Sequence, residues 1–268
     1  IFACHFPFVN MPGYYFLRMH QERSYVLALS GAPALPGMYY SVDPGGLSLR
    51  TAQGLLLAGG GGHRTGENRS GGAYASLARS AGLLFPGVRE AARWSAQDCM
   101  TLDGVPYIGP FSSSAPGWYV ATGFGKWGMT GSMASALLLR DLILGRRSPW
   151  AELFSPQRFT PAASLLDNGL HAARDLGRLP LTAARGPAQA LPPGHGGIVE
   201  AGGRKMGVYK TAEGTLYAVD PRCPHMGCQL EWNPDEESWD CPCHGSRFDC
   251  RGRLLSGPAQ KGLSGEKL

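Results

Sequence analysis

Short runs of alternating apolar and polar residues fill the first hundred positions, a pattern typical of β-strands with one buried face. Gly, Pro and Ser bound these runs, and we expect strands at residues 25–29, 38–42, 47–52, 55–58 and 90–94. Helical spacing of apolar residues predicts a helix over 71–84, which stops near Pro86. The first zone, to about residue 98, is therefore expected to be rich in strands, with one helix.

The pattern changes between residues 99 and 160. It predicts a strand at 118–122, a Gly-rich loop at 123–128 and a helix over 129–144 that ends at Gly145. A strand, a glycine loop and a helix in this order aim backbone N–H groups and a positive dipole end at an electron-rich ligand. Tight packing of helix on strand explains the same glycines equally well.

Pro and Gly interrupt the pattern between 156 and 193, where one short helix is expected at 162–176. The last zone has strand-like runs at 197–200, 205–210 and 216–219. The opening residues 1–7 lack a Met and resemble a buried strand already under way. We therefore expect the chain to be the C-terminal part of a longer protein.

Composition narrows the possible functions of these zones. The chain has 268 residues, 43% of them hydrophobic and 17% charged, which is enough for a sizeable core. The net charge is +5, but the basic residues are scattered, which argues against a nucleic-acid surface. No apolar run reaches the roughly 18 residues of a membrane span. We expect a cytoplasmic protein without a membrane span.

Cysteine and histidine gather near the end of the chain. Four of the seven cysteines lie between 223 and 243, and crowded Cys with interleaved His favours metal binding over a disulfide framework. Two boxes, beginning at Cys223 and Cys241, each offer one Cys and one His. The set Cys223, His225, Cys241 and His244 fits a two-iron cluster with mixed ligands. Zinc is the alternative, but it usually takes Cys-x-x-Cys pairs.

These boxes closely resemble the Rieske family, and among its members the cytochrome bc type, which carries a second Cys in each box. The resemblance implies a [2Fe–2S] cluster, a disulfide between Cys228 and Cys243, and a third loop around Pro258 that covers the cluster. It also implies that the Ser246 hydroxyl donates to a bridging sulfide.

One position departs from the family pattern. High-potential members have a Tyr that donates a hydrogen bond to a cysteine sulfur, and here that position holds Phe248. A missing donor destabilises the more negative reduced cluster. We expect a potential in the middle or lower part of the Rieske range.

Residues 103–109 and 121–128 resemble the C-terminal part of FAD-dependent oxidoreductases of the D-amino-acid/glycine oxidase type. In that family the loop and the following helix start pass under the flavin ring. The resemblance therefore implies cofactor contacts at Trp127, Gly128, Met129 and Thr130. It makes Arg50, His63 and Lys126 weak candidates for catalysis, although polar residues at strand ends serve structure equally often. His5 is a further residue that could approach the cofactor.

The expected fold class is α+β. Residues 1–160 would form the C-terminal part of the flavin domain, with an antiparallel substrate sheet at about 10–98 and a flavin-facing segment at about 99–145. A linker at 161–186 would lead to an all-β Rieske domain at 187–268. Residues 1–100 contain no G-x-G-x-x-G phosphate loop. We therefore expect the FAD-binding βαβ unit on a preceding segment, and this chain alone to be inactive.

The whole chain resembles bacterial FAD-dependent oxidoreductases with a fused Rieske domain. This resemblance implies that a small substrate, an amine or amino acid, reduces FAD, and that the cluster hands electrons to an external acceptor or carrier protein. Two alternatives stay open. The cluster could be structural or redox-sensing, because ligation couples to folding. A ring-hydroxylating oxygenase would need two His and a carboxylate around one iron, and no such His pair follows the boxes.

Overall fold

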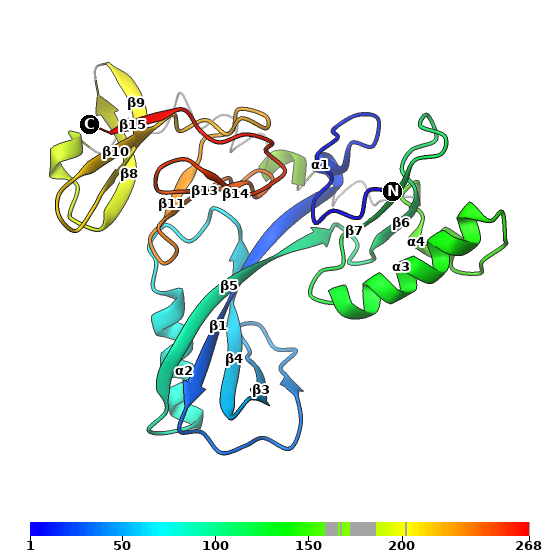
Figure 1. The fold of residues 1–268 in the computed structure, drawn as a ribbon, viewed down its shortest axis with the longest axis horizontal. Helices are drawn as coiled ribbons and strands as arrows, with labels where there is room; N and C mark the ends of the chain where they lie inside the picture. Colours follow the sequence, from blue (N-terminus) through cyan, green and yellow to red (C-terminus); the bar gives the residue numbers. More distant parts are fainter. Residues whose placement is uncertain (159–165, 167, 172–185, 202, 268) are drawn as a thin grey trace.

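The computed structural model describes residues 1–158, 166, 168–171, 186–201 and 203–267. An antiparallel five-stranded sheet in the order β2-β3-β4-β1-β5 occupies the first part of the chain (Figure 1). Its strands are β1 (Met19–Ser30), β2 (Tyr39–Tyr40), β3 (Ser48–Ala52), β4 (Leu55–Arg64) and β5 (Arg89–Thr101). The short helix α1 (Tyr15–Arg18) leads directly into β1.

Strand β1 lies between β4 and β5, and its side chains mostly alternate between buried and half-buried positions. Helix α2 (Ala73–Leu84) packs its buried Tyr74, Leu77 and Ala81 against buried residues of β1 and β4. The C-terminal end of β1 and the N-terminal end of β5 point away from the rest of the molecule (Figure 1). Near their other ends, Gln21 and Gln97 contact the last part of the chain.

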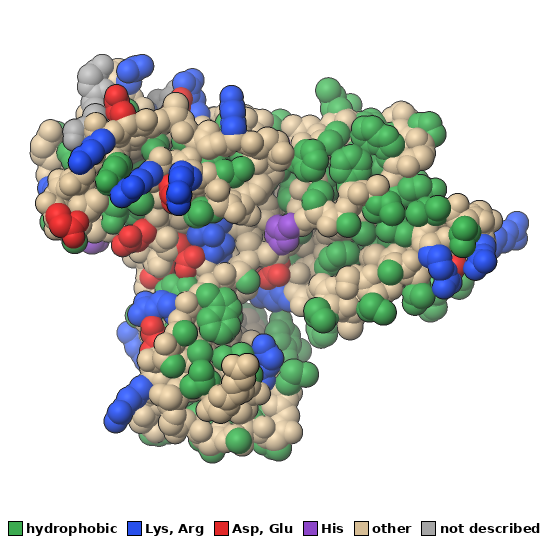
Figure 2. All heavy atoms as spheres, viewed as in Figure 1, with side chains coloured by type: hydrophobic (Ala, Val, Ile, Leu, Met, Phe, Trp, Pro, Cys, Tyr) green, Lys and Arg blue, Asp and Glu red, His purple; other side chains and the backbone are tan. Residues whose placement is uncertain are grey.

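A smaller unit follows, built from the hairpin β6 (Tyr107–Pro110) and β7 (Tyr119–Thr122) and the helices α3 (Gly128–Ile143) and α4 (Ala151–Phe154). Leu138 and Leu139 of α3 pack on Ile108 and Ala121 of the hairpin. Figure 2 shows many hydrophobic side chains on the surface of this side of the molecule. Trp127, Met129 and Met133 are among the exposed ones.

The last part consists of two antiparallel four-stranded sheets, in the orders β15-β10-β9-β8 and β11-β12-β13-β14. A core around Leu230, Trp232, Trp239 and Phe248 lies between them. The 3-10 turn η1 (Ala188–Ala190) precedes the strands β8 (His195–Ala201), β9 (Arg204–Lys210), β10 (Leu216–Val219), β11 (Glu231–Asn233), β12 (Ser238–Asp240), β13 (Arg247–Asp249), β14 (Leu254–Ser256) and β15 (Gly265–Lys267).

The α+β class is confirmed, and the structure corrects some details. The opening residues 1–7 do not form a strand. Phe2 makes an isolated bridge to Val120, and Phe6 turns into the core beside it, while Pro7 has no N–H to continue a ladder. The expected helix at 162–176 falls largely outside the described residues. Within the described part of the chain, no helix is long and apolar enough to cross a membrane.

Candidate metal centre and cofactor-facing cavity

Two matching turns present the Cys and His residues of the boxes. The first turn lies between β10 and β11, where the Gly227 N–H donates to the Cys223 carbonyl at 2.8 Å. The second lies between β12 and β13, where the Gly245 N–H donates to the Cys241 carbonyl at 2.9 Å. Both glycines have φ of +81°, a backbone conformation that residues with a Cβ rarely adopt. The C-x-x-x-G spacing of each box therefore follows from the turn.

A disulfide between Cys228 and Cys243 ties the two turns together, with a Cα–Cα distance of 6.5 Å. The expected pairing is confirmed. The sulfur of Cys241 lies within 4.8 Å of both disulfide sulfurs. The covalent link therefore holds the two turns at fixed separation immediately beside a candidate ligand.

The remaining Cys and His residues of the boxes lie close together; Cys223, Cys241 and His244 are buried, and His225 is half-buried. Cys223 and Cys241 are 2% and 0% exposed, and the Cys241 thiol hydrogen bond lowers the pKa of Cys223 to about 7. The His225 and His244 rings meet edge to face with centroids 4.9 Å apart. Two thiols and two imidazoles at one place are the donor set of a mixed-ligand two-iron cluster.

Both imidazoles are in the neutral form that metal ligation requires. Burial lowers the pKa of His225, and burial together with the charges of His225 and Arg64 lowers the pKa of His244 to about 3, so both rings are neutral. The Nε2 atom of His225 lies 2.8 Å from Asn10 Oδ1, which can only accept, so Nε2 carries the proton. The Nδ1 atoms of both rings are buried and have no hydrogen-bond partner among the described residues. Buried polar atoms are normally paired, so these lone pairs fit iron.

Other residues expected around the cluster lie next to the two turns. The Ser246 hydroxyl accepts from the Ala259 N–H at 2.9 Å, which holds the loop containing Pro258 against the second turn. A hydrogen bond from Ser246 also contributes to the lowered pKa of Cys223. Phe248 is 0% exposed and pairs with Trp239 across the sheet, with no polar atom to offer a sulfur.

The histidine edge of this site faces the first part of the chain. Asn10 bonds His225, and the Phe16 ring contacts His244 edge to face with centroids 5.8 Å apart. Phe6 lies on the same imidazole, with ring centroids 6.3 Å apart. Sequence reasoning did not find Asn10 and Phe16, because no local motif marks a residue that contacts a partner more than 200 positions away.

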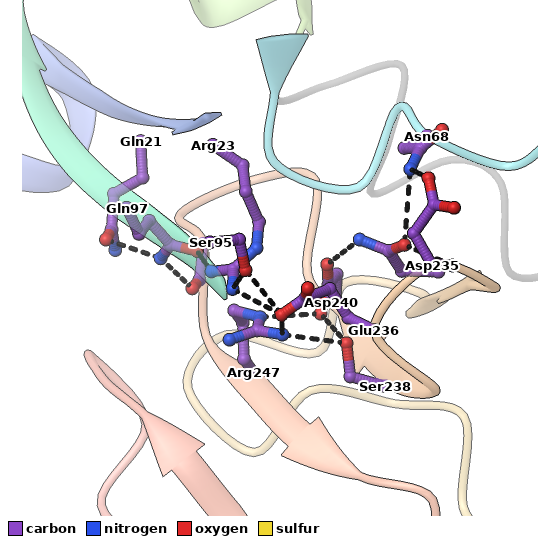
Figure 3. Close-up of polar contacts among 12 residues, drawn as sticks. Gln21, Arg23, Asn68, Ser95, Gln97, Asp235, Glu236, Ser238, Asp240 and Arg247 are labelled. Atoms are coloured by element: carbon purple, nitrogen blue, oxygen red, sulfur yellow. Dashed lines mark hydrogen bonds and ion pairs between the residues drawn. The ribbon is translucent and has the colours of Figure 1, made fainter. Parts of the chain in front are cut away.

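An acidic loop of the last part binds the sheet of the first part (Figure 3). The Glu236 carboxylate accepts from Arg23 at 2.8 Å, from Tyr74 at 2.6 Å and from Ser95, and it pairs with Arg247 at 3.3 Å. Burial opposes ionisation of Glu236, but the hydrogen bonds from Ser95 and Tyr74 and the Arg23 charge outweigh it and lower its pKa.

The neighbouring Asp235 reaches the N-terminus of α2. It accepts from the backbone N–H groups of Gly72 and Ala73 at 3.1 and 2.8 Å and from Asn68 at 2.8 Å. A carboxylate at this end of a helix satisfies free N–H groups and the helix dipole. The contacts of Glu236 and Asp235 therefore fix the position of the last part of the chain relative to the first part.

The Gly-rich loop borders a cavity of about 220 Å³. Its wall includes His5, Gln97, Asp98, Cys99, the loop 123–126 and Gly128. Helix α3 begins at Gly128 without a side-chain cap, so its first N–H groups are available to a ligand. Trp127 and Met129 are 68% and 87% exposed beside it, and Thr130 is also exposed. This uncapped helix start fits the electron-rich edge of a flavin.

A second cavity of about 700 Å³ lies over the sheet and shares Lys126 with the first. His63 lines it and hydrogen-bonds the Tyr25 hydroxyl at 3.0 Å. Glu22 also lines it, and hydrogen bonding to His20 lowers the pKa of that carboxyl. Arg50 is exposed on β3 and lines neither cavity. The structure thus brings His63 and Lys126 together and leaves Arg50 apart.

Known proteins resemble both parts of the chain. The FAD dependent oxidoreductase family matches residues 4–142, and the Rieske [2Fe-2S] domain matches residues 184–265. YhfW of Bacillus subtilis (strain 168), named as a Rieske 2Fe-2S iron-sulfur protein, is 38% identical over 98% of this chain and 54% of its own length. The cytochrome b6-f complex iron-sulfur subunit 1 of Nostoc sp. is 44% identical over 19% of this chain and 28% of its own.

Glycine oxidase from Geobacillus kaustophilus is similar in structure over 54% of this chain and 40% of its own, with a TM-score of 0.48 and 23% identity. The chain spans about half the length of YhfW.

Fold, site and matches define a flavin-dependent oxidoreductase family member with a fused iron–sulfur domain. The chain belongs to the FAD dependent oxidoreductase family and carries a C-terminal Rieske [2Fe-2S] domain. Its cofactors are FAD and a Rieske-type [2Fe–2S] cluster.

Proposed function

We propose that this protein passes electrons from a flavin to its Rieske cluster, and from there to an external one-electron acceptor. In this proposal Cys223 and Cys241 hold one iron, and His225 and His244 hold the other. When bound, a flavin accepts two electrons from a substrate and a Rieske cluster carries one electron at a time. Each substrate molecule oxidised therefore requires two successive transfers to the acceptor.

The observation that carries this proposal is the direction of the histidine edge. Asn10 holds the Nε2 proton of His225, while Phe6 and Phe16 cover His244. The exposed fraction of His244 is 2%, so this imidazole is closed to solvent and to large partners, whereas His225 is half-buried. In this proposal electrons enter through His244, which faces the flavoprotein part of the same molecule.

The residues of the cofactor-facing loop support the other end of this route. The proposed flavin contacts are the uncapped helix start at Gly128, Met129 and Thr130, with Trp127 beside it. Such N–H groups stabilise negative charge on a reduced cofactor. Since the chain spans 54% of YhfW, we propose that this chain alone is inactive and that residues outside it complete the flavin site.

An amine or amino acid is the proposed substrate class. The larger cavity presents the Glu22 carboxylate and the Lys126 ammonium, which suit a small charged molecule. The Lys126 charge also lowers the pKa of Glu22, so the carboxylate is ionised near neutral pH. His63, held by Tyr25, is the proposed residue that contacts this substrate.

Stopped-flow absorbance on the full-length protein tests the relay. Anaerobic mixing with a panel of amines and amino acids is expected to bleach the flavin first and the cluster second. A substrate that reduces the flavin, while the cluster stays oxidised and oxygen is consumed in air, would contradict the relay. Reduction of the flavin only by molecules of another class would contradict the substrate assignment alone.

A further inference from the structure

We propose that Gln21 and Gln97 are positioning residues that join the cofactor-facing cavity to the cluster and set the rate of electron transfer between them. The inference rests on the relay proposed above. The two glutamines lie on the neighbouring strands β1 and β5, and their side chains hydrogen-bond to each other (Figure 3).

On the cluster side the two amides bind three backbone carbonyls. Gln21 Nε2 donates to the carbonyl of His244 at 2.6 Å and to that of Gly257 at 3.3 Å. Gln97 Nε2 donates to the carbonyl of Gly245 at 2.6 Å and to Gln21 Oε1 at 2.6 Å. All four amide hydrogens are thus engaged. The pair holds the proposed ligand His244, its neighbour, and the loop that covers the cluster.

On the other side the same pair reaches the cavity. Gln97 lines its wall together with His5 and Gly123. An interaction with the Gln21 side chain opposes the lowering of the His5 pKa by burial. Hydrogen bonds run from the cavity through Gln97 to Gly245, and through Gln97 and Gln21 to His244.

The contact at Gly245 is close. A Cβ built on Gly245 would come within 2.6 Å of the Gln21 Cβ and 2.8 Å of its Nε2. Gly227 in the first box has the same φ of +81°, but a Cβ there would meet nothing within 4 Å. The backbone turn requires both glycines, and only Gly245 is also required by the approach of Gln21.

Gln21 is 1% exposed on an interior strand of the sheet, so its amide does not face solvent. A buried amide is costly unless all its partners are present. An apolar residue at this position would pack in the sheet without needing the bonds to His244 and Gln97. The fully bonded amide pair is explained by a requirement for one fixed distance between cavity and cluster.

The electron balance is simple. Each substrate molecule loses two electrons, which pass from the flavin to the cluster one at a time. Each transfer takes the cluster from its diferric form to its one-electron-reduced form. An external one-electron acceptor must reoxidise the cluster before the second transfer. The glutamines are neither oxidised nor reduced and transfer no proton. Their role is to fix the distance between the cavity and the cluster.

The test uses the full-length protein loaded with both cofactors. Light in the presence of EDTA reduces the flavin, and rapid freezing followed by low-temperature EPR measures the appearance of reduced cluster. We expect Gln97→Leu and Gln21→Leu to slow this step by about tenfold to a hundredfold, as a misplaced donor and acceptor do. Iron content and cluster midpoint potential should stay as in the unaltered protein.

Gln260→Leu is the matched control. Gln260 also donates to carbonyls of the covering loop, those of Pro258 at 3.0 Å and Ala259 at 3.4 Å, but it does not line the cavity. We expect it to leave the transfer rate unchanged. A purely structural role of the pair would lower iron content or shift the potential, while leaving transfer in the remaining loaded molecules at its normal rate, and that result would overturn the proposal.

If Gln21→Leu folds poorly, a comparison of two glycine variants tests the same proposal. Gly245→Ala and Gly227→Ala carry the same backbone strain, and Gly245→Ala alone displaces Gln21. Transfer should be about tenfold slower in Gly245→Ala than in Gly227→Ala, and hydrogen exchange at residues 244–247 should be faster. Equal rates in this pair, or a normal rate in Gln97→Leu, would overturn the inference. No cluster reduction in the unaltered protein would overturn the relay itself.

Discussion

The two cofactor regions are built in opposite ways. The candidate cluster ligands lie within 22 positions of one another, are largely shielded from solvent, and are tied by the Cys228–Cys243 disulfide. The cofactor-facing loop presents exposed side chains, with Trp127 at 68% and Met129 at 87%. A metal cluster requires all its ligands at bonding distance, so one short stretch supplies them. A flavin is large and is held along an extended surface, and in the proposed function this loop is one wall of that surface.

The comparison also shows what connects the regions. Gln21 and Gln97, on the neighbouring strands β1 and β5, both contact the cluster loop, and Gln97 also lines the cavity. The contacts of Glu236 with Arg23 and of Asp235 with Ala73 also hold the last part of the chain against the first part. The four predictions below test this contrast.

The largest effect is expected from His225→Ala. Losing one iron ligand removes the cluster, so iron content and the EPR signal of the reduced protein should fall nearly to background. Flavin content of the full-length protein should be retained, because the cofactor-facing loop is separate. Loss of the fold together with flavin would favour the structural alternative for the cluster over the relay.

Next comes Glu236→Ala, which leaves the buried Arg23 guanidinium, 3% exposed, without its carboxylate. Breaking such a pair costs about 3–5 kcal/mol of unfolding free energy. Urea unfolding followed by tryptophan fluorescence measures it. The neighbouring Glu237→Ala, at an exposed position, should cost less than about 1 kcal/mol. Similar costs for the two variants would show that the acidic contact does not hold the two parts together.

The pH dependence of stability follows from the same carboxylate. The pKa of Glu236 is lower in the folded protein than the ordinary value of 4.5, so its contribution is complete above that value. It is lost as the pH falls through the folded-state pKa. The stability difference between the unaltered protein and Glu236→Gln should therefore be constant near neutral pH and shrink below about pH 4.5. A difference that grows on acidification would contradict the assigned charge.

The smallest effect is expected from Phe248→Tyr, which offers a hydroxyl donor to a cluster sulfur. One hydrogen bond of about 1 kcal/mol to the reduced form raises a one-electron potential by about 40 mV. Redox titration of the cluster measures this shift, and Phe248→Leu, which adds no donor, serves as the control. A potential of the unaltered protein already at the top of the Rieske range would contradict the role given to Phe248.

Local chemistry explains which features the sequence could predict. The boxes, the disulfide and helix α3 depend on residues close together in the chain. Strand β4 continues through Gly59 to Gly62 and ends at Arg64, beyond the predicted end at 58. Ser48 and Leu77 occupy space that side chains at Gly59 and Gly60 would need, which explains glycine at these two positions. From the sequence alone, without the side chains that pack beside it, a run of glycines predicts a turn rather than a strand.

Contacts between distant segments explain what the sequence missed. Gln21 lies 223 positions from its partner His244, and Asn10 lies 215 positions from His225. A lone glutamine or asparagine has no periodicity or spacing that marks such a role. The fold alone brings these amides to the histidine edge of the cluster.

The most direct test of the relay is light-driven flavin reduction in the full-length protein, with cluster reduction followed by freeze-quench EPR at several protein concentrations. We predict that the reduced-cluster signal appears as the flavin is reoxidised, with a rate independent of protein concentration, because the transfer is internal. A rate proportional to concentration, or a flavin that stays reduced beside an oxidised cluster, would contradict it.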